Sequence, residues 1–288
     1  MPSFKTPSPI SVSLELVSGD VEITAGQRAD TVVVVRPSND TEASVQAAEQ
    51  TTVEFADGKL LIRGPKQRRS LFGWNNRNTP EEKDSAVHVV IELPEGSSVR
   101  GEVALGYLTG WGRLGDFRFK SACGNIQLEE SANLRVEAAL GDVAIGRVLG
   151  EADITAAQGN LRIDTVEGPV TIKNLSGTTH VGVVTGDVRL NATSGSVSLG
   201  HAYGNVEVKN TNGDIRVAQV TRGKVVLETT RGSVSVGVPE GVPAHLDART
   251  LIGSLNSVLD HSDAPVDSDQ AIQLRARTIY GDVEIHRP

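Results

Sequence analysis

Residues 177–217 read GTTHVGVVTGDVRLNATSGSVSLGHAYGNVEVKNTNGDIRV, and this stretch decides the fold. A glycine returns at every ninth position from Gly177 to Gly213. Each of these glycines opens a short phrase, such as GDVRL or GNVEV, in which apolar and polar residues alternate. Alternation with a period of two is typical of a half-buried β-strand. The stretch therefore predicts a succession of short strands separated by glycine corners.

The regular spacing of glycines, which we call the glycine lattice, continues in both directions from this stretch. The residue seven places after each glycine alternates between two series, with Val148, Val166 and Val184 in one and Thr193 and Thr211 in the other. Two kinds of corner therefore alternate, and the true period is about eighteen residues with two short strands per coil. This pattern predicts an all-β fold, a β-solenoid. The lattice comprises Gly106, Gly115, Gly124, Gly141, Gly150, Gly159, Gly168, Gly177, Gly186, Gly195, Gly204, Gly213, Gly223 and Gly232.

Stacking gives such coils their core. One coil cannot bury its own apolar strip, but stacked coils bury a continuous column. Glycine permits positive φ or a close backbone approach at the corners. An Asp or Asn beside it is expected to close the turn through a side-chain hydrogen bond. The predicted column contains Val143, Ile145, Leu161, Ile163, Val188, Leu190, Val206, Val208, Ile215 and Val217.

The flanks of the lattice complete the predicted organisation. An N-terminal β segment, continuous with the solenoid, spans residues 1–64, where the run TEASVQAAEQ fits either a short helix or an extended insertion. An exposed polar and aromatic loop follows at 65–85, then the solenoid repeats at 86–240 and a C-terminal capping segment at 241–288. Segments that break the period are expected at the ends, because open solenoid ends need covering.

Composition narrows the class of protein. The chain has 288 residues and a net charge of −8, which argues against nucleic-acid binding because such binders carry a basic patch. It shows no apolar run of 18 residues and no secretory signal. The single cysteine, Cys123, cannot form an internal disulfide and is expected to be a small, buried or half-buried side chain. These features predict a soluble, cytoplasmic protein.

Motifs that carry chemistry are weak in this sequence. Gly110–Gly115 matches G-x-G-x-x-G, but a strand phrase follows it where a dinucleotide site needs a helix. Each corner offers too few oxygens for the calcium sites of nonapeptide rolls. Glu151 and Asp187 fall two coils apart, about 10 Å, at the edge of the inverting-glycosidase range. The histidines show no metal-binding spacing. We therefore predict no catalytic residue, no cofactor and no metal.

The segment around residues 66–77 is the strongest candidate for an interaction site. It combines arginines with large apolar side chains, and Arg and Trp are enriched in binding hot spots. The same side chains also fit a hydrophobic lid over an exposed solenoid edge, or contact with an anionic membrane surface. The candidate interaction loop consists of Arg68, Arg69, Leu71, Phe72, Trp74 and Arg77.

Three features together resemble a known family. They are the T-x-S/N-G-D/S-V/I strand repeat, a VPEG segment, and the closing run LRARTIYGDVEI at 274–285. They are similar to the bacterial "putative adhesin" β-strand-repeat family of unknown function, over residues 86–288 and more loosely over 10–64. The resemblance implies a surface-associated or envelope-associated interaction protein with no established catalytic residues.

These observations favour a non-enzymatic, adhesin-like scaffold or interaction protein that presents an extended β-solenoid surface. A protein partner or self-association is expected, and incomplete capping would let copies stack end to end. Two alternatives stay open at this point. One is a carbohydrate-active β-helix enzyme that uses Glu151 and Asp187, and the other is a peripheral membrane-associated scaffold that binds through the 66–77 segment.

Overall fold

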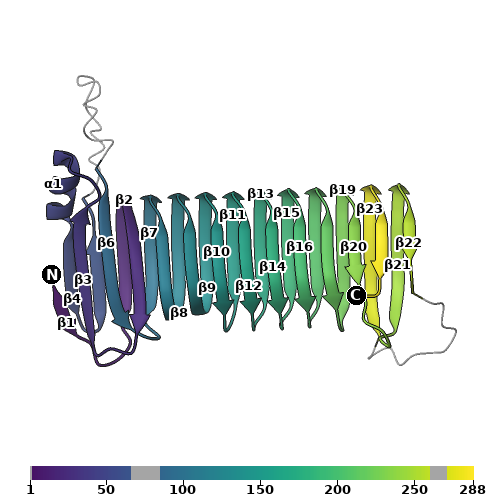
Figure 1. The fold of residues 1–288 in the computed structure, drawn as a ribbon, viewed down its shortest axis with the longest axis horizontal. Helices are drawn as coiled ribbons and strands as arrows, with labels where there is room; N and C mark the ends of the chain where they lie inside the picture. The colour runs from purple at the N-terminus through teal and green to yellow at the C-terminus, as the bar shows by residue number, and fades with distance from the viewer. Residues whose placement is uncertain (1, 66–84, 260–270) are drawn as a thin grey trace, which may run out of the picture. The chain divides into compact units, whose positions relative to one another are not determined.

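The computed structural model describes residues 2–65, 85–259 and 271–288. The chain forms two compact units, Met1–Gly141 and Asp142–Pro288. In each unit the described residues are mostly β-strand, and the strands wind into stacked coils (Figure 1). The predicted all-β fold, a β-solenoid, is confirmed.

The first unit is organised around one long strand, β2, which serves two sheets. Its first half pairs in parallel with β5 and β7, and its second half pairs with β6 and β8. The elements of this unit are β1 (Ser3–Lys5), β2 (Ser11–Gly26), β3 (Asp30–Pro37), α1 (Glu42–Gln50), β4 (Thr52–Ala56), β5 (Lys59–Arg63), β6 (Val87–Pro94), β7 (Ser98–Leu105), β8 (Leu108–Cys123) and β9 (Ile126–Leu140).

The run TEASVQAAEQ is helical in the structure. The Thr41 side chain caps α1 by accepting a hydrogen bond from the Ser44 N–H. The Ser44 hydroxyl in turn accepts one from the Ala86 N–H, which ties the helix to the start of β6. A polar N-cap and an alanine-rich run are sufficient local reasons for this helix.

Short antiparallel strands end both sheets of the first unit. β3 pairs antiparallel with β6, β1 pairs with β3, and β4 pairs with β5. Phe4 on β1 and Phe55 on β4 stack with ring centroids 4.9 Å apart, which joins the two sheet edges. Short, covered edge strands present few free backbone groups to another chain. The outer strands at this end of the unit, β1 and β4, are therefore short.

The second unit is the regular part of the solenoid. From β10 to β20 the even-numbered strands form one parallel sheet and the odd-numbered strands from β11 to β19 form the other. Its strands are β10 (Val143–Val148), β11 (Ala152–Gln158), β12 (Leu161–Val166), β13 (Val170–Ser176), β14 (Thr179–Val184), β15 (Val188–Ser194), β16 (Val197–Ala202), β17 (Val206–Asn212), β18 (Ile215–Val220), β19 (Lys224–Arg231), β20 (Val234–Gly237), β21 (Ala244–Ile252), β22 (Leu255–Ser257), β23 (Ile272–Tyr280) and β24 (Val283–His286).

The strand register confirms the eighteen-residue period. Val143 lies beside Leu161, and Leu161 lies beside Thr179. All ten residues predicted for the interior column are buried, so their apolar side chains form a continuous core between the two sheets. Burial of this kind, at roughly 25 cal/mol per Å² of apolar surface, is the main favourable term that holds the coils together.

The corner glycines are required by a close backbone approach between coils. At Gly195, φ is +125°, and a Cβ atom would lie 2.1 Å from the carbonyl oxygen of Gly177 in the preceding coil. Neither the dihedral angle nor the contact accommodates a larger residue. Glycine recurs at these corners because the backbones of successive coils approach each other too closely for a side chain.

The acids and amides beside these glycines act differently from the sequence-based expectation. We expected them to close their own turns. The side chain of Asp142 instead accepts a hydrogen bond of 2.7 Å from the main-chain N–H of Asn160, one coil further on. Asn160 repeats this contact with Thr178, and Asp214 does so with Ser233. The reason is geometric, because stacked corners bring the next main-chain N–H within reach of each side chain.

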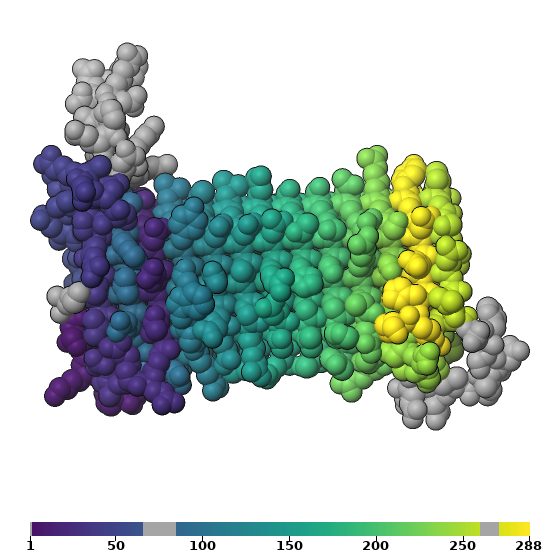
Figure 2. Space-filling model, in the orientation of Figure 1, coloured from purple at the N-terminus to yellow at the C-terminus, as the bar shows by residue number. Residues whose placement is uncertain are grey.

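The coils at the end of the second unit are not stacked in chain order. β23 pairs on one side with β19 and on the other with β21, and β24 likewise lies between β20 and β22. Figure 1 shows β23 between β19 and β21, and Figure 2 shows the same coil in yellow, flanked on both sides by earlier residues. The outermost coil is therefore Ala244–Ser257, and the last coil of the chain is inserted beneath it.

Candidate interaction groove in the first unit

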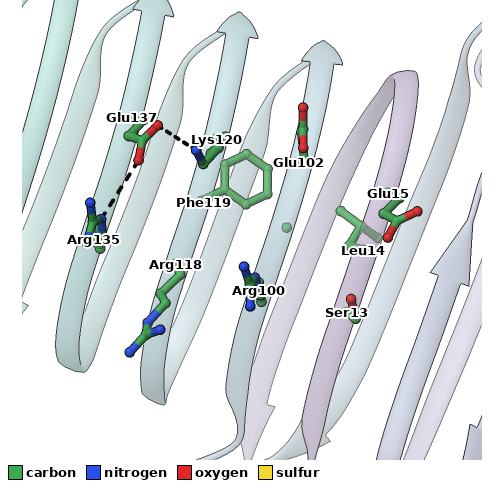
Figure 3. Close-up of a pocket in the computed structure, with 11 residues that line it drawn as sticks. Ser13, Leu14, Glu15, Arg100, Glu102, Arg118, Phe119, Lys120, Arg135 and Glu137 are labelled. Carbon is green, nitrogen blue, oxygen red and sulfur yellow. Dashed lines mark ion pairs between the residues drawn. The ribbon is translucent and has the colours of Figure 1, made fainter.

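A groove of about 530 Å³ lies on the outer face of β2, β7, β8 and β9 in the first unit (Figure 3). Charged side chains dominate its walls, and the strand positions of Leu14, Gly101 and Phe119 lie between them. The side chains of Leu14 and Phe119 are themselves buried on the inner face of the sheet. We call it the charged groove. It is lined by Ser13, Leu14, Glu15, Arg100, Gly101, Glu102, Arg118, Phe119, Lys120, Arg135 and Glu137.

Strand alternation explains why charges gather there. On β7, Val99, Gly101 and Val103 point into the core, so Arg100 and Glu102 point outwards. The same alternation continues on β8 and β9, and the parallel register aligns the outward residues from strand to strand. Two straight rows result, which run across the strands about 4.8 Å per step.

The first row consists of arginines. Arg100 lies beside Arg118, and Arg118 lies beside Arg135, on three neighbouring strands. All three side chains are exposed. Figure 3 shows them side by side along the groove. Among the described residues, neither Arg100 nor Arg118 forms an ion pair. Like charges placed directly opposite each other destabilise a sheet by a few tenths of a kcal/mol or more.

The second row is mostly acidic and is partly neutralised. The Glu137 carboxylate lies 2.8 Å from the Lys120 ammonium group and 3.8 Å from Arg135 Nε. The hydrogen bond from Lys120 holds the pKa of the Glu137 carboxyl below its ordinary value, with a smaller contribution from the nearby arginine. At the other end of the row, Glu15 pairs with Arg63 at 3.4 Å. Four cationic side chains and three carboxylates line the groove, and Arg100 and Arg118 are the two cations that form no ion pair among the described residues.

The second unit gives a contrast. There Arg189 lies beside Glu207 on the next strand of its sheet, and the two form an ion pair at 3.4 Å. Glu207 also pairs with Lys209 at 2.7 Å, and the hydrogen bond from that ammonium group lowers the pKa of Glu207. Alternating charge is the arrangement that stabilises an outer solenoid face. The arginine row departs from it.

The predicted interaction loop lies outside the described residues. Its residues fall between the described ranges 2–65 and 85–259, and they are Arg68, Arg69, Leu71, Phe72, Trp74 and Arg77.

The two candidate catalytic acids lie at corners of the second unit. The register of β11, β13 and β15 places Glu151 and Asp187 at equivalent corners two coils apart. Asp187 Oδ1 accepts a hydrogen bond of 2.9 Å from the main-chain N–H of Asn205 and one of 3.1 Å from its side chain. This carboxylate therefore holds two neighbouring coils together.

Cys123 corrects one expectation. We predicted a buried or half-buried side chain, but the thiol is exposed. Cys123 occupies a corner position, in register with Leu105 and Leu140, which are also exposed. Strand alternation points the side chains of this row away from the core, and only residues on the opposite face of the sheet are buried.

The G-x-G-x-x-G match is part of a strand, as predicted. Gly110–Gly115 lies within β8, and β8 continues after it to Cys123. Between Gly110 and Arg113 the pairing with β9 shifts by one residue, and Gly112 has φ of +77°. The glycines thus accommodate a β-bulge.

Two further findings concern metals and membranes. In the described ranges, no group of three or more His, Cys, Asp or Glu side chains is placed to hold a metal ion. Across the same residues, no helix has the length and apolar character needed to cross a membrane.

Sequence reasoning did not find the charged groove. Arg100, Arg118 and Arg135 are separated by eighteen and seventeen residues, and each one alone looks like an ordinary solvated charge. The period itself contained the signal, because residues one period apart become neighbours in a solenoid. Reading the outward positions in steps of eighteen would have revealed the first two arginines.

The sequence pattern of the Toastrack family (DUF4097) matches residues 8–286. The chain belongs to the Toastrack family. This confirms the resemblance to a bacterial β-strand-repeat family of uncharacterised function. The Toastrack chain is also similar to the crystal structure of a "putative cell adhesion protein" from Clostridium sporogenes, at 12% identity and a TM-score of 0.23, over 100% of this chain and 98% of that one. No curated protein shows a significant match.

Proposed function

We propose that this Toastrack protein is a non-enzymatic, adhesin-like interaction scaffold whose charged groove binds an acidic segment of a partner protein. The arginine row carries the proposal. Three arginines lie side by side on strands about 4.8 Å apart, and neither Arg100 nor Arg118 forms an ion pair among the described residues. A bound row of carboxylates would relieve this repulsion.

The chemistry of arginine favours carboxylate ligands. A guanidinium group offers a planar fork of N–H donors that matches a carboxylate with two parallel hydrogen bonds. Such charge-assisted hydrogen bonds are worth about 1.5–3 kcal/mol each. A peptide with several Asp or Glu residues that crosses β7, β8 and β9 would meet each arginine in turn.

The overall charge of the protein opposes the binding of an acidic peptide. With a net charge of −8, the chain as a whole repels an acidic peptide. Binding therefore has to come from a local positive site. Because the groove is open to solvent, its affinity is expected to fall as salt rises and the Debye length shortens.

Fluorescence anisotropy with a labelled polyglutamate peptide tests the proposal. We expect the wild-type chain to bind and Arg100→Glu/Arg118→Glu to lose at least tenfold in affinity. The matched control is Arg162→Glu/Arg216→Glu, which makes the same charge change at two exposed arginines of the second unit. The control should bind almost as well as wild type. Equal losses in the two variants, or no binding by wild type, would refute the proposal.

A further inference from the structure

The outermost coil of the second unit, Ala244–Ser257, exposes a surface that every earlier coil buries. β21 pairs only with β23 and β22 only with β24 among the described strands. Leu246 is 39% exposed, whereas Leu274, its neighbour one coil inwards, is 1% exposed. Leu255 is 46% exposed, and its neighbour Val283 is fully buried. The coil therefore ends in an open apolar layer with two free strand edges.

From this surface we infer that a second copy of the chain docks here, with β21 of each copy pairing antiparallel across a two-fold axis. The two strands of a coil run in opposite directions on the two sheets. A two-fold axis perpendicular to those sheets turns each edge strand onto its own copy in antiparallel orientation. Such an isologous contact closes after two copies and satisfies the free edges.

The sequence of β21 is self-complementary about Ala248. An antiparallel pair centred there places Asp247 opposite Arg249 of the second copy, and the reverse pair forms by symmetry. Each Arg249 then lies between the Asp247 of its own strand, at 2.9 Å, and that of the other copy. Opposite charges directly across a strand pair stabilise the pairing.

The other positions of this register are also compatible. Leu246 and Thr250 continue the inward rows of Leu274 and Thr278, and they meet across the axis inside the joined core. Ala248 meets itself there, where a larger side chain would crowd the axis. On the outer face, His245 lies opposite Leu251, which is 76% exposed. Docking therefore covers the open layer and leaves no like charges opposed.

The local electrostatics favour an acidic partner group at this position. Asp247 alone faces Arg249, Arg275 and Arg277, with Arg277 at 2.7 Å and Arg275 at 3.9 Å. Glu228 shares Arg275 at 3.6 Å. At this edge the two carboxylates of Asp247 and Glu228 thus form ion pairs with three guanidinium groups. In this register the second copy places its own Asp247 beside Arg249 and its own Arg249 beside Asp247, so each new cross-strand contact pairs opposite charges.

Disulfide cross-linking tests the register directly. The background is Cys123→Ser, which removes the exposed natural thiol. In His245→Cys/Leu251→Cys, each new thiol faces its partner across the axis, at a Cα separation of about 4.5–5.5 Å that suits a disulfide. Within one chain, residues 245 and 251 lie about 20 Å apart, so no internal bond can form. We expect oxidation to produce a covalent dimer from the double variant only.

The single variants sharpen this experiment. In His245→Cys alone, the two copies of residue 245 would lie about 20 Å apart, and Leu251→Cys behaves in the same way. Equal cross-linking by a single variant would overturn the register. Absence of a covalent dimer from the folded double variant would overturn the proposal itself. Both positions are exposed, so circular dichroism should show an unchanged fold.

A measurement of mass gives the second readout. Sedimentation equilibrium should give about 61 kDa for wild type, twice the 30.4 kDa of one chain. Asp247→Arg opposes two arginines at each contact and should shift the chain to monomer, and Asp247→Arg/Arg249→Asp should recover the dimer. Asp164→Arg is the matched control, because Asp164 forms the same kind of pair with Arg162 on the covered strand β12. A monomeric wild type, which would leave the edge to a different protein, overturns the proposal.

This inference and the proposed function fail independently. The dimer involves only β21 and β22 of the second unit, and the charged groove involves only the first unit. Loss of polyglutamate binding with an intact dimer would remove the groove alone.

Discussion

Replacing Gly195 with alanine is expected to destabilise the chain by about 2–6 kcal/mol. Its φ of +125° lies in a region that side chains other than glycine rarely adopt, at a cost of about 1–3 kcal/mol. The added Cβ would also lie 2.1 Å from the carbonyl oxygen of Gly177, so one of the two coils has to shift. Overpacking of that kind costs a further 1–3 kcal/mol or so.

Two other glycines separate these contributions. Gly241 has φ of +74° with no atom within 4 Å of the added Cβ, so Gly241→Ala tests the backbone cost alone, about 1–2 kcal/mol. Gly26 has neither a positive φ nor a neighbour within 4 Å. Gly26→Ala is therefore expected to change stability by less than about 1 kcal/mol, in either direction.

Urea unfolding followed by circular dichroism measures all three variants. With a slope of about 1–3 kcal/mol per molar urea, Gly195→Ala should lower the midpoint by about 0.7 M or more. The expected order of stability is Gly26→Ala above Gly241→Ala above Gly195→Ala. If Gly195→Ala unfolded at the wild-type midpoint, the corners could not be stacked as closely as described.

Three further substitutions test the core, the buried corner and the open edge. Phe117→Ala should cost about 3–5 kcal/mol in urea unfolding, because Phe117 is fully buried; a loss below 1 kcal/mol would contradict that burial. Asn210→Ala should cost about 1–3 kcal/mol, because its buried amide donates to two glycine carbonyls; wild-type stability would contradict this. The hydrogen bond from Arg277 lowers the pKa of Asp247 in the folded chain. The ionised Asp247 carboxylate therefore stabilises the fold above its unfolded-state pKa, near 4, and this stabilisation is lost as pH falls through its lower folded-state pKa. Asp247→Asn should therefore reduce the acid-side loss of stability between about pH 5 and 2, and an unchanged pH profile would contradict this.

The repeat made most of the architecture predictable from sequence. Strand alternation and the glycine lattice each depend on local chemistry, so both can be read without a structure. The seventeen-residue step from Gly124 to Gly141 also has a local cause. The coil that begins at Gly106 has the regular eighteen residues and the next coil has seventeen, so the pairing of β8 with β9 shifts by one residue between Gly110 and Arg113. The spacing of the glycines in the sequence thus already indicates this register shift.

The order of the last coils could not be read in the same way. Arg249-Thr250-Leu251-Ile252-Gly253 and Arg277-Thr278-Ile279-Tyr280-Gly281 are nearly equivalent phrases, and either one fits either slot. Local chemistry identifies both as coils, but which one lies outermost depends on pairing between distant strands. The charged groove escaped prediction for the same reason, because its rows run across the strands.

Distances between spin labels test the stacked, inverted order of coils most directly. Thr155, Glu228, Arg277 and Arg249 lie in one outward row of the second unit, through the successive pairings of β11, β13, β15, β17, β19, β23 and β21. At about 4.8 Å per coil, residue 155 should lie about 19 Å from residue 228, 24 Å from residue 277 and 29 Å from residue 249.

Double electron–electron resonance on cysteine pairs, in the Cys123→Ser background, measures these distances. The account predicts that residue 249 is farther from residue 155 than residue 277 is, by about one coil spacing. The reverse order would mean that the coils stack in chain order and that Ala244–Ser257 is not the open end. Distances that do not increase along the row would contradict the solenoid itself.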